Sequence, residues 1–109
     1  MASEFTQALY DAVSKIPRGK VSTYGQLAFL IGHPRASRIV GAAMARVPES
    51  LSLPCHRVIY GDGRLCCNQA FGGIQRRLLE QEGVTFLEDG RVDLKKHLWN
   101  TEPEEGPGA

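Results

Sequence analysis

Two short apolar segments separated by a helix breaker constrain the fold of this chain most strongly. Residues 25–31 (GQLAFLI) and 36–47 (ASRIVGAAMARV) each suit a short helix, and Gly32-His33-Pro34-Arg35 interrupts the helical pattern between them. The second segment is rich in small residues, which let a helix sit close against a partner. Two such helices joined by a tight turn are typical of a DNA-binding helix-turn-helix. A helical hairpin that serves only the core has the same pattern and remains the alternative.

The remaining segments predict a small, mainly α-helical domain with a short strand or two, in a winged-helix-like arrangement around the helix-turn-helix. Ser3 is suited to cap a helix that begins at Glu4 and ends before Pro17. Further along the chain, we expect an extended connection at 20–24, a strand carrying Cys55 and His56, a turn at 61–63, a loop at 65–73, a helix at 74–83 and a hairpin within 84–94.

The length and the segment boundaries predict one domain at residues 1–100 and a disordered tail at 101–109 (TEPEEGPGA), which is acidic and rich in Pro and Gly. No apolar run approaches the roughly 20 residues that span a bilayer, and the N-terminus lacks a signal-peptide pattern. We therefore expect a protein without membrane contact, located in the cytoplasm, or in the nucleus of a eukaryote. Because no segment resembles a dimerisation helix, we also expect a monomer.

Basic residues are concentrated in one part of the chain. Residues 15–57 contain seven lysines and arginines but only one acid, Glu49, whereas the whole chain carries a net charge of only +1. Such a basic region favours a surface that faces phosphates. A solvated surface of mixed charge is the alternative.

The cysteines and histidines predict reduced thiols, with no disulfide framework and no metal site. The three cysteines are odd in number, and Cys66 and Cys67 are adjacent, whereas zinc sites usually space their cysteines by two to four residues. The histidines, His33, His56 and His97, are scattered along the chain.

The run Pro54-Cys55-His56-Arg57-Val58 places a thiol beside an imidazole. A cysteine becomes a nucleophile as its thiolate, and histidine is the commonest side chain that helps to form it at neutral pH. Adjacency alone is weak evidence, because neighbouring side chains on a strand point to opposite faces.

The Cys55-His56 pair lies within a series of four motifs, which follow one another along the chain: GKVSTYGQLA, RASRIVGAAM, LPCHRVI and GG-x-QRRLLEQEG. From residue 5 to residue 99 the chain resembles the DNA-binding and catalytic domain of the O6-alkylguanine-DNA alkyltransferases (methylated-DNA–protein-cysteine methyltransferases). It also resembles their short relatives, the alkyltransferase-like proteins. The resemblance implies a DNA repair protein that binds O6-alkylguanine in double-stranded DNA through minor-groove contacts, flips the base out and transfers the alkyl group irreversibly to cysteine. One alternative is a protein that binds the lesion without transfer and flags it for nucleotide-excision-repair proteins; another is a helix-turn-helix regulator.

The same resemblance implies a role for each matching residue. Cys55 would accept the alkyl group, His56 would act as its base through a bound water, and Glu82 would orient His56. Tyr24 would help to rotate the nucleotide and donate a hydrogen bond near the base. Arg38 would fill the space that the flipped base leaves. The remaining implied contacts are Arg35, Ala36, Ser37 and Gly41 for DNA, and Pro54, Val58, Ala70, Phe71 and Gly72 for the base pocket.

The chain also departs from the alkyltransferase pattern. Val47 stands where the full-length enzymes usually carry an asparagine, and the loop before Gly72-Gly73 has a different sequence. The C-terminal EGVTFLEDGRVDLKKHLW is closer to the alkyltransferase-like proteins, which typically carry tryptophan at the position of Cys55. We interpret Arg57 as the structural partner of an acid, and Phe86 and Trp99 as core residues.

Overall fold

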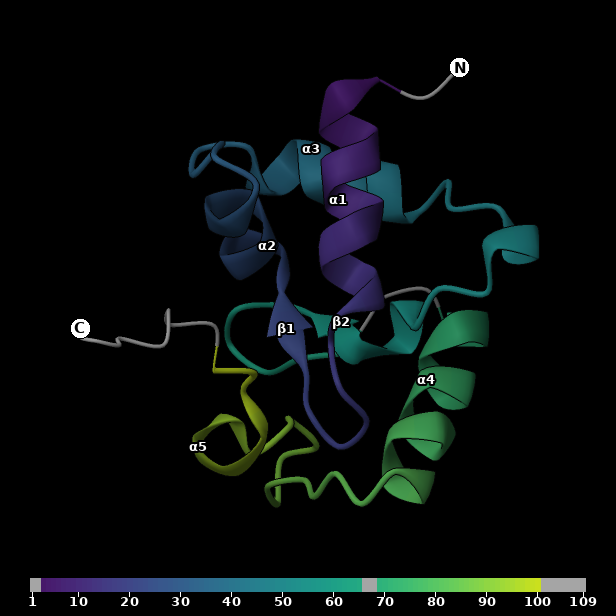
Figure 1. Ribbon diagram of the computed structural model, residues 1–109. Coiled ribbons are helices and arrows are strands. Elements are labelled where there is room, and N and C mark those ends of the chain that lie inside the picture. Colours follow the sequence, from purple (N-terminus) through teal and green to yellow (C-terminus); the bar gives the residue numbers. More distant parts are fainter. Residues whose placement is uncertain (1–2, 66–68, 101–109) are drawn as a thin grey trace.

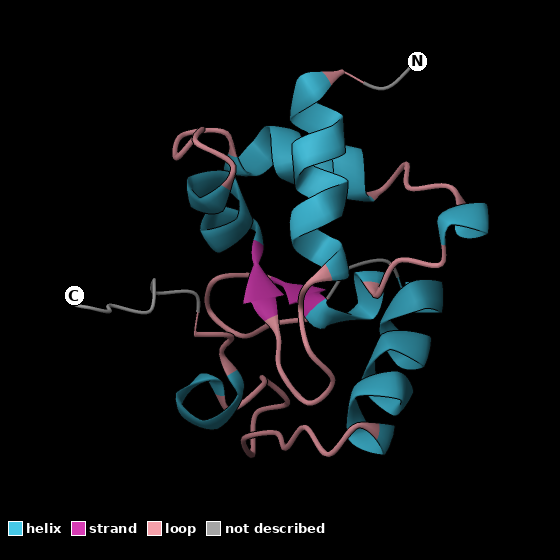
Figure 2. Ribbon diagram, viewed as in Figure 1, coloured by secondary structure: helices cyan, strands magenta, loops and turns pink. Residues whose placement is uncertain are grey.

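In the computed structural model, which describes residues 3–65 and 69–100, five α-helices surround a two-stranded parallel sheet (Figure 1). The short strands lie at the centre of the molecule, with helices and long loops on all sides (Figure 2). In chain order the elements are α1 (Glu4–Ser14), β1 (Ser22–Thr23), α2 (Tyr24–Leu30), α3 (Ser37–Met44), the 3₁₀ turns η1 (Glu49–Leu51) and η2 (Cys55–Arg57), β2 (Val58–Ile59), α4 (Gln69–Gln81) and α5 (Leu94–His97). The predicted fold class is confirmed.

Helices α2 and α3 form the predicted helix-turn-helix. The Thr23 side chain caps α2 by accepting a hydrogen bond from the backbone amide of Gln26 (3.0 Å). Gly32, with a φ of +85°, then makes the turn toward α3. The helices pack on α1, whose Ser3 cap is also confirmed. This packing buries one core cluster, composed of Leu9, Val13, Ile16, Leu27, Ala28, Val40 and Val58, with Trp99 at its edge.

The parallel sheet connects this helical layer to a second core cluster. Ser22 pairs with Val58 and Thr23 with Ile59. The second cluster contains Val21, Ile59, Leu79, Val84 and Val92, with Phe86 packed against it. Phe86 and Val92 face each other in the predicted hairpin, so the assignment of Phe86 and Trp99 to the core is confirmed.

Two predicted elements were wrong. Cys55 and His56 lie in a 3₁₀ turn, because the Arg57 amide donates to the Pro54 carbonyl (3.0 Å). In a 3₁₀ turn, successive side chains are about 120° apart, so the two need not face opposite ways as on a strand. Helix α4 begins at Gln69, five residues before the predicted start at residue 74. The paired glycines suggested a loop, but glycine inside a helix costs only about 1 kcal/mol and packing can override it.

The sheet also places two distant segments of the chain at its opposite ends, which are only two residue pairs apart. Tyr24 comes directly after the C-terminal end of β1, and Cys55-His56-Arg57 come directly before the N-terminal end of β2.

Among the described helices, none is long and apolar enough to cross a membrane. The predicted tail at 101–109 lies outside the described residues.

Candidate functional site

A cavity of about 1120 Å³ opens between the helix-turn-helix and the segment that carries Cys55. Its wall brings together six residues that the sequence predicted for catalysis or binding: Tyr24, Ser37, Arg38, Gly41, Cys55 and Val58. They come from the start of α2, from one side of α3, and from η2 and β2. Residues more than 30 positions apart in the chain therefore share one site.

Cys55 is a half-buried free thiol in the cavity wall. Burial raises the pKa of this thiol, and a hydrogen bond with the backbone of the same residue offsets part of the rise. The thiol form is therefore favoured at neutral pH, and a base is needed to generate the thiolate.

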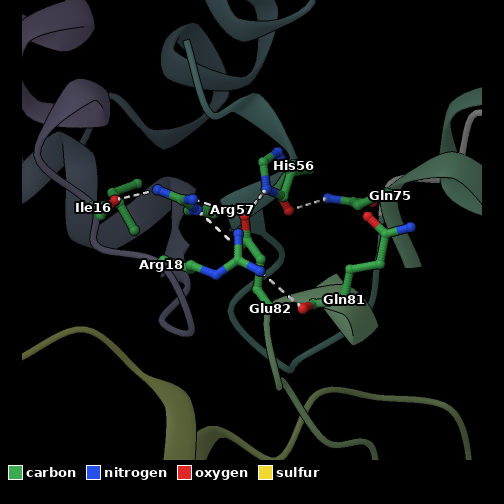
Figure 3. A network of polar contacts seen from close by, with 7 residues as sticks. All are labelled: Ile16, Arg18, His56, Arg57, Gln75, Gln81 and Glu82. Carbon is green, nitrogen blue, oxygen red and sulfur yellow. Dashed lines mark hydrogen bonds and ion pairs between the residues drawn. The ribbon is translucent and has the colours of Figure 1, made fainter. Parts of the chain in front are cut away.

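His56 is held by Glu82, as the resemblance implied. The imidazole Nε2 lies 2.8 Å from the Glu82 Oε2, in a pair that is largely shielded from solvent (Figure 3). Because an ionised carboxylate can only accept hydrogen bonds, Nε2 carries the proton of the neutral imidazole. The other nitrogen, Nδ1, is then left as the proton acceptor. Within the described residues, no direct hydrogen bond joins the Cys55 thiol to this ring.

Arg57 holds the same carboxylate from the other side. Its Nε and Nη2 donate to the Glu82 Oε1 (2.9 Å) and Oε2 (2.7 Å), and its Nη1 donates to the Ile16 carbonyl (2.7 Å) (Figure 3). The expectation that Arg57 pairs with an acid is confirmed. Burial alone would raise the pKa of Glu82, but the hydrogen bonds from Arg57 and His56 outweigh it and lower the pKa to about 2. Glu82 is therefore ionised whenever the protein is folded near neutral pH.

Gln75 is a buried polar residue that was not predicted from the sequence. Its side chain is 0% exposed, and its Nε2 donates to the backbone carbonyls of His56 (3.2 Å) and Val58 (3.0 Å). One available signal was its spacing of four residues from Leu79 and seven from Glu82, which predicts one helix face; Glu82 itself lies just past the end of the helix. The Gln75 side chain thus holds the backbone of the Cys55–Arg57 turn, and Glu82, directly after α4, holds its side chains.

Replacing Gln75 with leucine should lower the free energy of unfolding by about 1–3 kcal/mol, because two buried carbonyls lose their donor. Urea denaturation followed by circular dichroism measures the change. Gln81→Leu on the exposed side of the same helix is the matched control and should change stability by less than about 0.5 kcal/mol. Equal stabilities of the two variants would contradict a supporting role for the Gln75 amide.

The other predicted residues have different positions. Arg35 is exposed in the turn before α3, and Ala36 precedes α3 and packs against the first core cluster. Pro54 adjoins Cys55 but is not among the described residues of the cavity wall. The side chains of Ala70, Phe71 and Gly72 lie outside the described part of the structure, as do Cys66 and Cys67. Val47 and Tyr60, for which no binding role was predicted, line the cavity.

Comparison with known proteins gives one consistent result. Residues 4–84 match the family of the 6-O-methylguanine DNA methyltransferase, DNA binding domain. A DNA base-flipping protein of Escherichia coli (strain K12) is 41% identical over 96 residues, which cover 88% of this chain and 74% of that protein. A methylated-DNA–protein-cysteine methyltransferase of Haemophilus influenzae is 38% identical over 98 residues, which cover 87% of this chain but only 53% of the methyltransferase.

The fold agrees with these sequence matches. The crystal structure of Schizosaccharomyces pombe Atl1 in complex with damaged DNA containing O6-carboxymethylguanine superimposes with a TM-score of 0.78 and 37% identity. The match covers 92% of this chain and 99% of that one. The relatives thus include proteins named for base flipping and proteins named for methyl transfer.

Proposed function

Because this chain belongs to the alkylguanine-DNA alkyltransferase family of DNA-binding repair proteins, we propose that it binds O6-alkylguanine in duplex DNA and transfers the alkyl group to Cys55. The observation that carries the proposal is the composition of one cavity. Cys55 shares its wall with Tyr24 and Arg38, and the next residue in the chain, His56, is hydrogen bonded to an ionised Glu82.

The transfer is balanced without any cofactor. The thiol proton passes toward Nδ1 of His56, through a bridging water, and the sulfur attacks the alkyl carbon. A carbon–sulfur bond forms as the bond between that carbon and O6 breaks, and the electron pair returns to the guanine. The guanine takes up one proton from water while Tyr24 donates a hydrogen bond near the base, and His56 releases the proton it took from the thiol to water, so that no net proton is gained or lost. Because the thioether is stable, each molecule reacts once.

The base must leave the helix for this reaction, since a thiol in a cavity wall cannot reach O6 inside an intact duplex. We propose that Arg38, which is exposed on α3, fills the vacated space; Ser37 and Gly41 line the same cavity wall. We propose that α3 enters the minor groove, where contacts depend little on sequence, as repair at any site requires. Arg35 and Ala36 at the start of the helix would then face the DNA backbone.

Arg38→Ala should weaken binding to a lesion-containing duplex by a few kcal/mol at most, about 100-fold or less, because one of several DNA contacts is lost. Fluorescence anisotropy with an O6-methylguanine duplex measures the change, and the same duplex without the lesion reports non-specific binding. Arg35→Ala is the matched control, since that arginine is exposed but outside the cavity wall, and it should affect both duplexes equally. Unchanged affinity of Arg38→Ala for the lesion would exclude the space-filling role.

The proposed transfer is tested by intact-mass spectrometry after incubation with a short duplex that contains one O6-methylguanine. A gain of about 14 Da on the peptide that holds Cys55 is the expected result. No gain, with a preference for the lesion over undamaged duplex, would favour recognition without transfer. No gain and no preference would leave only a helix-turn-helix that binds DNA.

Recognition without transfer is the second candidate function, and two observations favour it. The chain is 41% identical to a protein named for base flipping and 37% identical to Atl1, whose structure is a complex with damaged DNA. Burial also raises the pKa of the Cys55 thiol. In this case nucleotide-excision-repair proteins would be the partners that act on the flagged lesion. Either function would place a monomer in the bacterial cytoplasm or the eukaryotic nucleus, where the DNA is.

A further inference from the structure

Tyr60 belongs to the cavity wall but has no part in the proposed reaction. It comes directly after β2 and lines the cavity together with Tyr24 and Cys55. The parallel register explains its position: Thr23 pairs with Ile59, so the residues that directly follow the two strands, Tyr24 and Tyr60, leave the sheet side by side. Their ring centroids are 5.3 Å apart with an interplanar angle of 65°, which is an edge-to-face contact.

Tyr60 is itself fixed by the turn at its C-terminal side. Its amide donates to the Arg64 carbonyl (3.0 Å), and its carbonyl accepts from the Gly63 amide (2.9 Å). Gly63 has a φ of +94°, and an added Cβ would lie 3.0 Å from the Val92 carbonyl oxygen, so the turn is set by glycine and by close packing. The guanidinium carbon of Arg64 lies 5.4 Å from the centroid of the Tyr60 ring, within cation–π distance.

The Tyr24 ring also lies close to α3. A Cβ built on Gly41 would lie 3.9 Å from the Tyr24 Cδ1, an ordinary van der Waals distance, so α3 passes close to this ring. The ring is therefore close both to the helix that carries Arg38 and to the ring of Tyr60. A residue that flanks a binding ring in this way limits the orientations that the ring can adopt.

We propose that Tyr60 is a positioning residue that holds the Tyr24 ring in the orientation required for the flipped guanine. The inference rests on the proposed function, because Tyr24 acts on the base only if the protein binds the lesion. Without Tyr60, the edge-to-face contact is lost and Tyr24 samples other rotamers. Lesion affinity should then fall about two- to twelve-fold, the equivalent of one aromatic pair, while affinity for undamaged duplex stays the same.

The experiment compares Tyr60→Leu, Tyr60→Phe and the native protein. Two-dimensional NMR follows the ring protons of Tyr24, whose chemical shifts depend on the neighbouring ring, and anisotropy gives the affinity for duplexes with and without O6-methylguanine. Tyr10→Leu is the matched control, since Tyr10 is a half-buried tyrosine that packs on the first core cluster outside the cavity wall. We expect Tyr60→Leu to shift the Tyr24 signals and to reduce lesion selectivity. Tyr60→Phe and Tyr10→Leu should each keep the native Tyr24 signals and the native selectivity.

The outcomes separate this inference from the function on which it rests. If the native protein prefers the lesion and the Tyr60→Leu variant keeps the full preference, the positioning role is overturned and the proposed function stays intact. Unmoved Tyr24 signals in Tyr60→Leu would overturn it as well. A native protein without lesion preference would overturn the proposed function, and the positioning role with it.

Discussion

Replacing Cys55 with serine should abolish alkyl transfer completely while the protein still binds the lesion. Serine has nearly the same shape, so the 3₁₀ turn and the cavity wall should remain intact. Its hydroxyl, however, is a far weaker nucleophile than a thiol near neutral pH, and the base His56 cannot compensate for the difference. In the mass assay with an O6-methylguanine duplex, the native protein should gain about 14 Da and the variant nothing.

The chain offers a matched control for this experiment. A double variant, Cys66→Ser with Cys67→Ser, removes the other two thiols and should react like the native protein. If methyl transfer persists in Cys55→Ser but disappears in the double variant, the acceptor is Cys66 or Cys67 and not Cys55. Loss of lesion binding in Cys55→Ser would instead show that the thiol is needed to form the cavity.

The sequence predicted the parts of the fold that depend on local pattern. The breaker at residues 32–35 and the apolar segments on either side were sufficient to predict the helix-turn-helix. Ser3 was sufficient to predict where α1 begins. The start of α4 was missed because Gly72 and Gly73 have a low helix propensity, and packing can override that propensity.

The candidate site could be predicted only in part, because its geometry depends on contacts between distant segments. The contact between His56 and Glu82 was expected from the resemblance to a known family, and the structure bears it out at 2.8 Å. The hydrogen bonds from Arg57 to the same Glu82 carboxylate could not be expected from sequence spacing, since Arg57 and Glu82 are 25 positions apart. The contact of Tyr24 with Tyr60 requires the strand register, which two-residue strands do not reveal in a sequence.

The largest stability effect is expected at Glu82, whose side chain is only 7% exposed. Glu82→Gln keeps the shape of the residue but removes the charge that Arg57 and His56 share. The pKa of Glu82 falls from 4.5 to about 2 in the folded protein. This depression corresponds to about 3 kcal/mol at neutral pH, since each pKa unit is worth about 1.4 kcal/mol. Urea denaturation at pH 7 should show a loss of this order in the variant.

The pH dependence identifies the charge as the cause. Because the folded-state pKa is depressed, the stabilisation by the ionised carboxylate is fully present above pH 4.5 and is lost as the pH falls toward 2. The difference in stability between the native protein and Glu82→Gln should therefore shrink over this interval. Glu80→Gln, near the end of the preceding helix α4, is the matched control: its ion pair with Arg76 is exposed, so its removal should cost less than about 1 kcal/mol. A difference for Glu82→Gln that stays constant from pH 7 to pH 3 would mean that packing, and not the shared charge, holds His56 and Arg57 in place.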